Sequence, residues 1–458
     1  MRTERDALGE KAVPDDACYG AHTARSLENF QVGGEKVPIE IIYGMVKLKW
    51  ACARANAELG GLPKSKAEAI AKACRRVLAG EFDDQFVLDV FQAGSGTSSN
   101  MNVNEVIASL AAEELGGKRG DRRLVNPHDD VNRGQSTNNI FPSGVRIAAV
   151  ERSAALLAAV RLLEESFRAK AAEFADVIKS GRTHLRDAVP VTLGQEFGAY
   201  AHALEKDIRR IEAARQKLRE LGVGGNAVGT GVNTKKEFRP LVIRELSVLA
   251  KELYEGAENG IEATQFLTDL AEMSAMLRLL ALDLQKICND LRLLSSGPNT
   301  GLGEIELPAV EPGSSIMPGK VNPSICEAVN MVCMQVMGLD HAVSLACGAG
   351  QLELNTHMPL AGANLVKALR LLDHACAMLR EKCVDGITAH RAACERHFKA
   401  SAALATILNP KLGYDRVAEL VKESLRSGRP LGELVLEKKI LTEAEWKDLL
   451  RKSTGPNL

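Results

Sequence analysis

Long stretches of this chain carry apolar residues at intervals of three or four and contain almost no proline or glycine. The clearest examples are Val160, Leu163, Phe167, Ala171, Phe174 and Ile178 in the segment 145–179, and Met276, Leu280, Leu284, Ile287, Leu291 and Leu294 further on. Such spacing places one apolar stripe along a helix. Unbroken segments of 30 or more residues far exceed the ordinary helix of about 11 to 12 residues. The sequence therefore predicts a mainly α protein built around an elongated bundle.

The bundle region is flanked by segments of different character. Residues 1–135 are richer in glycine and asparagine, which predicts an N-terminal domain of mixed and helical structure. The long helices fall in 136–391, with further helical stretches at 193–221, 324–345 and 355–383. From 392 to 458 the helices shorten and charges increase, which predicts a small helical C-terminal domain. Strand signals are sparse and short, as in Phe86-Val87-Leu88.

Several central helices are rich in alanine, leucine and methionine on more than one side. A helix that is apolar on more than one side needs a packing partner on each of them. We therefore expect the bundle core to continue across subunits into a homo-oligomer.

Composition excludes several classes of protein. Apolar residues make up 45% and charged residues 26%, as in soluble globular proteins, and the net charge of −1 favours neither nucleic acid nor an anionic membrane. No apolar run approaches the roughly 18 residues of a membrane span, and the charged N-terminal stretch lacks the apolar core of a signal peptide. The ten cysteines form no CxxC pair, so neither a zinc site nor a disulfide framework is expected. A reducing, cytoplasmic setting follows.

Four polar islands interrupt the helices. They are GSGTSSNMN at 94–102, QSTNN at 135–139, GRTHLRD at 181–187, where we expect the first long helix to end at Gly181, and GSSIMPGKVNP at 313–323. Each has a purely structural explanation when taken alone, as a helix cap, a turn or a histidine at a helix end. The first lacks the GK[ST] ending of a phosphate-binding P-loop. None contains a metal-ligand cluster, so no metal or cofactor is expected.

Together the islands offer many neutral hydrogen-bond donors, one histidine and one lysine. That inventory suits a small, highly oxygenated anion such as a dicarboxylate. Asn322 followed by Pro323 is typical of an N-cap and a first helical residue, so the positive end of the next helix would face the loop. Arg182 and Arg186 could add charge or serve the structure.

These motifs resemble those of the aspartase/class II fumarase superfamily, and the likeness extends from YGAHTARSLENF to the C-terminal region. The resemblance implies a three-domain fold, a homotetramer with a twenty-helix core, and active sites each built by three subunits. It also implies removal of a proton from Cβ and of a leaving group from Cα of a succinyl-type substrate. The partner would be a small dicarboxylate, with no nucleic acid and no membrane.

The resemblance also implies roles for particular residues. Ser314 matches the general base, and Glu327 matches the acidic partner of the histidine. Groups that match ligands of one substrate carboxylate are Thr183, His184, Lys320 and Asn322. Groups that match the pocket for the other carboxylate and the leaving group are Ser95, Thr97, Ser136, Thr137 and Asn138. These roles are physically reasonable, because an enediolate needs preorganised positive charge, a serine base needs activation, and a closing loop excludes water.

The motifs distinguish less clearly between ammonia and water as the leaving group. Ser95 and the stretch GEIELPAVEPGSS resemble fumarases, whereas Thr137, AGQLELN, EKCVDGITA and VLEKKILTEAE resemble aspartases. We favour deamination of L-aspartate over hydration of fumarate. Asn139 stands where both groups usually have Asp, and Asn126-Pro127-His128 replaces the HPN motif of a second fumarase site, which we do not assign. A catalytically silent structural relative and a nucleotide-binding protein using GSGTSSN are remoter alternatives.

Overall fold

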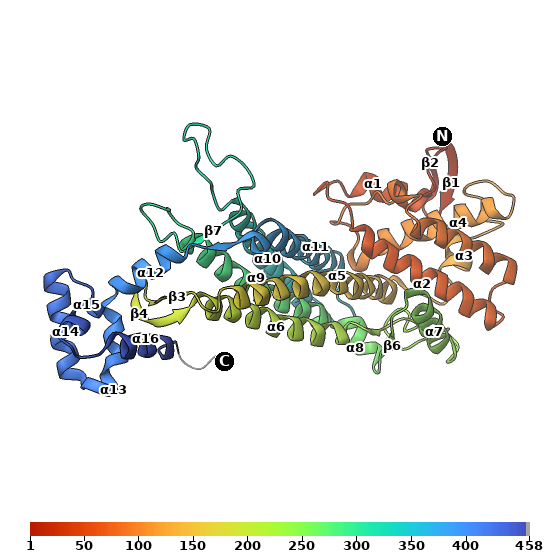
Figure 1. Ribbon diagram of the computed structural model, residues 1–458. Helices are drawn as coiled ribbons and strands as arrows, with labels where there is room; N and C mark the ends of the chain where they lie inside the picture. The colour runs from red at the N-terminus through yellow and green to blue at the C-terminus, as the bar shows by residue number, and fades with distance from the viewer. Residues whose placement is uncertain (455–458) are drawn as a thin grey trace. The chain divides into compact units, whose positions relative to one another are not determined.

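The computed structural model describes residues 1–454 (Figure 1). Its α-helices are α1 Ala21–Asn29, α2 Ile39–Glu58, α3 Lys64–Leu78, α4 Thr97–Glu114, α5 Thr137–Glu173, α6 Leu193–Lys217, α7 Phe238–Ala250, α8 Gly260–Gln265, α9 Thr268–Leu294, α10 Ser324–Gly348, α11 Met358–Lys382, α12 Arg391–Ala400, α13 Asn409–Leu412, α14 Tyr414–Ser427, α15 Leu431–Glu437 and α16 Glu443–Lys452. Short 3-10 or π turns are η1 Asp83–Gln85, η2 Gly94–Gly96, η3 Pro127–Val131, η4 Val384–Gly386 and η5 Ala402–Leu408.

The described strands form four two-stranded sheets. The strands are β1 Arg2–Asp6, β2 Gly9–Val13, β3 Ile178–Thr183, β4 Arg186–Thr192, β5 Glu220–Leu221, β6 Glu255–Gly256, β7 Ile305–Glu306 and β8 Thr388–Ala389. They pair in the order β1–β2, β3–β4, β5–β6 and β7–β8, and only β5–β6 is parallel. The strand signal at Phe86-Val87-Leu88 is wrong, because these residues form no strand and only the next residue, Asp89, makes an isolated bridge with Lys36.

The chain forms two compact units. Unit 1 comprises Met1–Leu157, Arg209–Leu279 and Met334–Leu372, and unit 2 comprises Ala158–Ile208, Leu280–Cys333 and the chain from Asp373 onward. The long helices α5, α6, α9, α10 and α11, of 25 to 37 residues, contribute to both units. The prediction of a mainly α fold with a bundle of long helices is confirmed. The division into three sequence domains stays a prediction.

An aromatic cluster shows why the apolar stripe of α5 forms a helix-packing face in unit 2. Phe167 of α5 and Phe174, the residue that follows α5, pack against Phe197 and Tyr200 of α6, with ring centroids between 5.3 and 5.9 Å apart. All four side chains are buried. Tilted and edge-on pairs at this separation add stabilisation beyond area burial. The Tyr200 hydroxyl, which could not be buried unpaired, donates to Asp290 at 2.9 Å.

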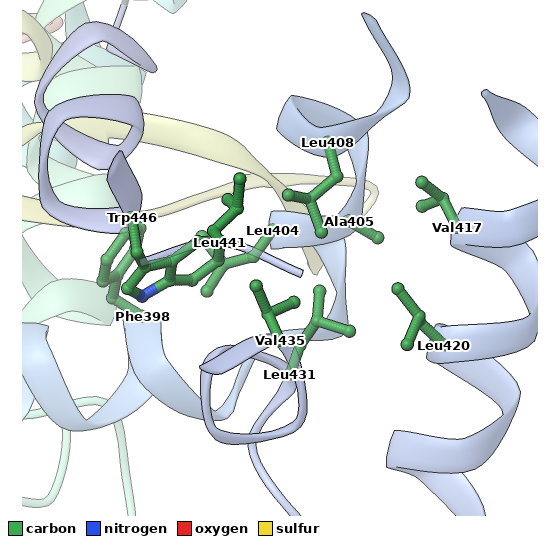
Figure 2. Close-up of a cluster of buried hydrophobic side chains, with 10 residues drawn as sticks. All are labelled: Phe398, Leu404, Ala405, Leu408, Val417, Leu420, Leu431, Val435, Leu441 and Trp446. Carbon is green, nitrogen blue, oxygen red and sulfur yellow. The ribbon is translucent and has the colours of Figure 1, made fainter. Parts of the chain in front are cut away.

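The short C-terminal helices of unit 2 have a small core of their own (Figure 2). Its members are Phe398, Leu404, Ala405, Leu408, Val417, Leu420, Leu431, Val435, Leu441 and Trp446. Ile178, at the start of β3, packs against this cluster. The last helix begins with a capping box between Thr442 and Glu445. The cluster therefore supports the hairpin that carries the third polar island.

Candidate active site

The first polar island forms the tight turn that begins α4. Ser95 and Gly96 have φ of 61° and 85°, in the left-handed region. A Cβ on Gly96 would lie 2.3 Å from the Phe141 ring, so only glycine fits there. Thr97 is the first residue of α4, and no side chain caps this helix at its N-cap position. Helix N-termini attract anions, so the turn and the Thr97 hydroxyl suit a carboxylate.

The second island begins α5 and lies against the first. The Asn100 amide donates to the Thr137 hydroxyl oxygen at 3.0 Å and so links the starts of α4 and α5. Asn138 donates to the carbonyl of Ala227 at 2.7 Å. The Ser136 hydroxyl accepts from the backbone of Asn138 at 3.2 Å. Unit 1 therefore gathers the predicted residues Ser95, Thr97, Ser136, Thr137 and Asn138 at the N-termini of two helices.

The third island is the β3–β4 hairpin, not the end of a helix. The first long helix ends at Glu173, and Gly181 lies within β3, where a Cβ would meet the Val189 carbonyl at 2.7 Å. The expected helix end at Gly181 is therefore wrong, because antiparallel pairing with β4 claims the backbone hydrogen bonds of 178–183. His184 and Leu185 form the two-residue turn between the strands, with φ of 53° and 57°.

This turn holds two non-glycine residues in a left-handed conformation that ordinarily costs about 1–2 kcal/mol per residue. Type I′ hairpin turns prefer Asn-Gly at these positions. Strained backbone of this kind is concentrated at functional sites, where the surrounding structure over-determines it. The hairpin thus presents Thr183 and His184 on the exposed end of a ribbon anchored elsewhere in unit 2.

That anchor is Glu304, a carboxylate with no exposed surface. It receives two hydrogen bonds from Arg182 at 3.0 and 2.7 Å, an ion pair from Lys179 at 2.8 Å and a contact from His397 Nδ1 at 3.1 Å. Burial alone would raise the pKa of Glu304, but Arg182, Lys179 and His397 overcome it and lower the pKa to about 2. Arg182 therefore serves the structure. Sequence reasoning missed this cluster, because its members are far apart along the chain.

The fourth island is a loop between β7 and α10 that projects from the helices of unit 2 (Figure 1). The Ser314 hydroxyl oxygen accepts from the backbone N–H groups of Ile316 at 3.2 Å and Met317 at 3.0 Å. Gly313 closes the loop through a 2.9 Å bond from its N–H to the Lys320 carbonyl. Both donors point at the Ser314 oxygen, and donors in this position stabilise negative charge that develops on it during a reaction.

Asn322 is not the N-cap that its place before Pro323 predicts. Helix α10 begins at Ser324, two residues later, and the Asn322 amide donates to the Gly313 carbonyl at 2.7 Å. This hydrogen bond closes the base of the loop. Glu327 lies in the first turn of α10, with its carboxylate 3.8 Å from Arg292. Thr183, His184, Ser314, Lys320, Asn322 and Glu327 all belong to unit 2.

A buried lysine lies beneath the second island, and sequence reasoning missed it. Lys49 of α2 is fully buried, and its ammonium donates to the side-chain oxygens of Asn100 at 2.7 Å and Asn132 at 2.8 Å. Burial lowers the pKa of Lys49 to about 7. The sequence signal that could have revealed the buried lysine is its position between Leu48 and Trp50 on an apolar face of α2.

Comparison with known proteins agrees with this architecture. Residues 9–338 match a family described as lyase, and residues 404–454 match the fumarase C C-terminus. An aspartate ammonia-lyase from Pseudomonas fluorescens is 46% identical over 456 residues, covering 98% of this chain and 95% of that protein. A fumarate lyase:delta crystallin structure from Brucella melitensis, bound to cobalt, has a TM-score of 0.96 at 45% identity and covers 99% of this chain and 100% of that one.

A class II fumarase from Schistosoma mansoni is similar in structure, with a TM-score of 0.95 at 38% identity over the full length of both chains. The helical bundle, the lyase match and the full-length likeness define a lyase of the fumarase type. The chain belongs to the aspartase/class II fumarase superfamily. Within residues 1–454 no group of three or more His, Cys, Asp or Glu side chains could hold a metal ion.

Proposed function

We propose that this protein catalyses the reversible deamination of L-aspartate to fumarate and ammonia. The full-length likeness to aspartate ammonia-lyase, at about 45% identity, supports this reaction. The structural observation that carries it is the Ser314 hydroxyl, which accepts hydrogen bonds from two N–H groups of its own loop. A serine held in this way can act as the base for a weakly acidic proton.

In the proposed mechanism Ser314 takes the proton from Cβ of aspartate. The electron pair enters the adjacent carboxylate, which becomes a dianionic enediolate. Lys320 and Asn322, with Thr183 and His184, bind that carboxylate and stabilise the charge that develops on it. The pair then returns to form the carbon–carbon double bond as the Cα–N bond breaks and ammonia leaves.

We assign the other carboxylate and the leaving group to the helix N-termini of unit 1. Thr97 and Ser95 border the start of α4, and Ser136, Thr137 and Asn138 border the start of α5. Neutral hydroxyl and amide donors at helix N-termini suit a carboxylate without adding titratable groups. We assign Glu327 as the acidic partner of the active-site histidine, in a site that other copies of the chain help to build.

A homotetramer with shared sites accounts for two observations. Although the sequence contains no unbroken apolar run of membrane-spanning length, helix α10 is apolar enough to span a membrane by length and composition, and only 33% of its most apolar 18 residues are buried. Met331, Met334 and Leu345 are 65%, 58% and 63% exposed, and other copies of the chain would cover them. Helix α5 has 37 residues and is therefore about 55 Å long, so its two ends serve different sites.

Two further proposals concern the setting of the enzyme. All ten cysteines are free in the described chain, which supports a reducing, cytoplasmic location. The substrate is a small dicarboxylate, and we propose no nucleic-acid or membrane partner.

Fumarate hydratase is the second candidate, favoured by Ser95 and by the likeness to a class II fumarase. The deciding experiment follows the ultraviolet absorbance of fumarate with L-aspartate or L-malate as sole substrate. We expect fumarate to form from aspartate. Turnover of malate alone would establish the hydratase, and turnover of neither would favour a silent structural relative.

A further inference from the structure

The buried Lys49 has no carboxylate partner among the side chains that it bonds. Its two acceptors are the amide oxygens of Asn100 and Asn132. The titratable groups that act on it are the Cys52 thiol of its own helix and the Cys74 thiol of α3. A buried ammonium held only by neutral groups is costly for a fold, because its charge remains uncompensated.

The carboxylates on the elements packed against α2 are either exposed or engaged elsewhere. Glu105 of α4 accepts from the backbone of Gly20 and Thr23. Asp130 of η3 pairs with a lysine of α3 at 2.7 Å, and Glu245 of α7 hydrogen-bonds to Arg54 of α2. The positive charge of Lys49 is therefore available to a group that arrives from outside.

The hydrogen bonds around Lys49 have a fixed direction. An ammonium only donates, so Asn100 must present its oxygen to Lys49 and keep its NH₂ group for other acceptors, one of which is the Asn132 oxygen at 3.3 Å. That NH₂ group donates to the Thr137 oxygen at 3.0 Å. Because the Thr137 oxygen already accepts this bond, its own proton is free to point away from Asn100, toward an acceptor in the pocket.

We propose that Lys49 is a positioning residue for dicarboxylate binding, which orients the Asn100 amide so that Thr137 donates to the bound carboxylate, and which places positive charge beneath it. The inference rests on the proposed function, because it places Thr137 in the substrate pocket. Without Lys49 the Asn100 amide can flip, so that its oxygen faces Thr137. The Thr137 hydroxyl can then donate its hydrogen bond to Asn100 instead of to the substrate. Bonds in such a chain polarise one another, so the ammonium strengthens the last donor.

The charge also makes binding depend on pH. Burial lowers the pKa of free Lys49 to about 7, and a bound dianion favours the charged form and raises that pKa again. With a separation of about 8 Å between Lys49 and the ligand charge taken as a working value, and an effective dielectric of about 20, one unit charge changes affinity by about 30-fold. Binding therefore takes up a proton, and affinity falls as the pH rises above 7.

The experiment measures the dissociation constant of succinate, a dicarboxylate without a leaving group, by titration calorimetry between pH 6 and pH 9. In the wild type we expect the constant to rise about 20-fold over this range. Near pH 7.8, in buffers of different ionisation enthalpy, we expect uptake of about 0.7 proton per site. Lys49→Met should bind succinate about 30-fold more weakly at pH 6. Its dissociation constant should not show the rise of about 20-fold between pH 6 and pH 9.

Lys47→Met is the matched control, because Lys47 lies two residues earlier on α2 and pairs with Glu151. It should keep the affinity and the pH dependence of the wild type. If Lys49→Met does not fold, Asn132→Asp takes its place, since a carboxylate beside the ammonium cancels its field and keeps it protonated. Asn132→Asp should weaken binding and abolish the same pH dependence.

The inference is overturned if a folded Lys49→Met, or Asn132→Asp, binds succinate with the affinity and pH dependence of the Lys47→Met control. That outcome leaves the proposed function intact when the wild type converts aspartate. A wild type that neither binds succinate nor forms fumarate would overturn the proposed function itself.

Discussion

Glu304 offers the sharpest test of how unit 2 holds its part of the site. Replacing it by glutamine removes the carboxylate but leaves Lys179, Arg182 and His397 facing each other. The pKa of Glu304 is lowered from 4.5 to about 2, which corresponds to about 3 kcal/mol of stability. We expect Glu304→Gln to lose at least about 3 kcal/mol at pH 7, because Arg182 also loses its bidentate carboxylate partner and Lys179 keeps only Glu196.

The sign of the pH dependence follows from the lowered pKa. A carboxyl group with a depressed pKa in the folded state contributes its full stability above the unfolded value of 4.5. That contribution is lost as the pH falls toward 2. The difference between wild type and Glu304→Gln should therefore be nearly constant from pH 7 to pH 4.5 and be smaller by about 2 kcal/mol at pH 3.

Urea unfolding at matched protein concentration measures this difference. Trp446 lies in the C-terminal cluster of unit 2 and Trp50 in unit 1, so a Trp50→Phe background makes fluorescence report on unit 2 alone. Glu306→Gln, two residues further on and exposed, is the matched control. Equal urea midpoints for the two variants at pH 7, or a difference that does not shrink at pH 3, would refute the assigned role of Glu304.

Three further predictions concern the reaction and the pocket. Ser314→Ala should lower kcat by about 10²- to 10⁴-fold with substrate binding retained, and a variant with more than about a tenth of wild-type kcat rules out a general base. Mixed tetramers reassembled from inactive His184→Ala and Lys320→Ala subunits should regain up to about a quarter of the activity if different chains supply the two groups. No recovery in verified mixed tetramers would contradict shared sites. Asn139 donates to the Asn226 carbonyl at 2.6 Å, so Asn139→Asp should cost about 1–3 kcal/mol in thermal unfolding, and an unchanged midpoint would contradict this.

Local pattern was sufficient to predict the helices. The stripe at Val160, Leu163 and Phe167 is buried in α5, because residues three and four apart share a helix face. The same rule placed most of the α9 stripe in the core, although Met276 is only half-buried. The four polar islands lie at the starts of α4 and α5, in the β3–β4 hairpin and in the loop before α10, so glycine- and hydroxyl-rich segments marked places where the chain changes its local structure.

Pairing between distant segments was beyond that reasoning. Residues 178–192 form a hairpin, but the local sequence does not show which carbonyl group each backbone N–H will bond. Asn322 looks like a helix cap beside Pro323, yet its amide bonds to a carbonyl nine residues earlier. A side chain chooses the partner that the fold brings within reach, and sequence spacing does not contain that information.

The sequence by itself determined the helical class, the places where helices break and the kinds of side chain available at each break, because these depend on contacts within a few residues. Only the tertiary structure decided which breaks come together. It placed Lys49 under Thr137 and Glu304 under the His184 hairpin, where burial turns ordinary charged residues into groups with shifted pKa values. Electrostatic energy inside a protein depends on distance and burial, and neither is a property of the linear chain.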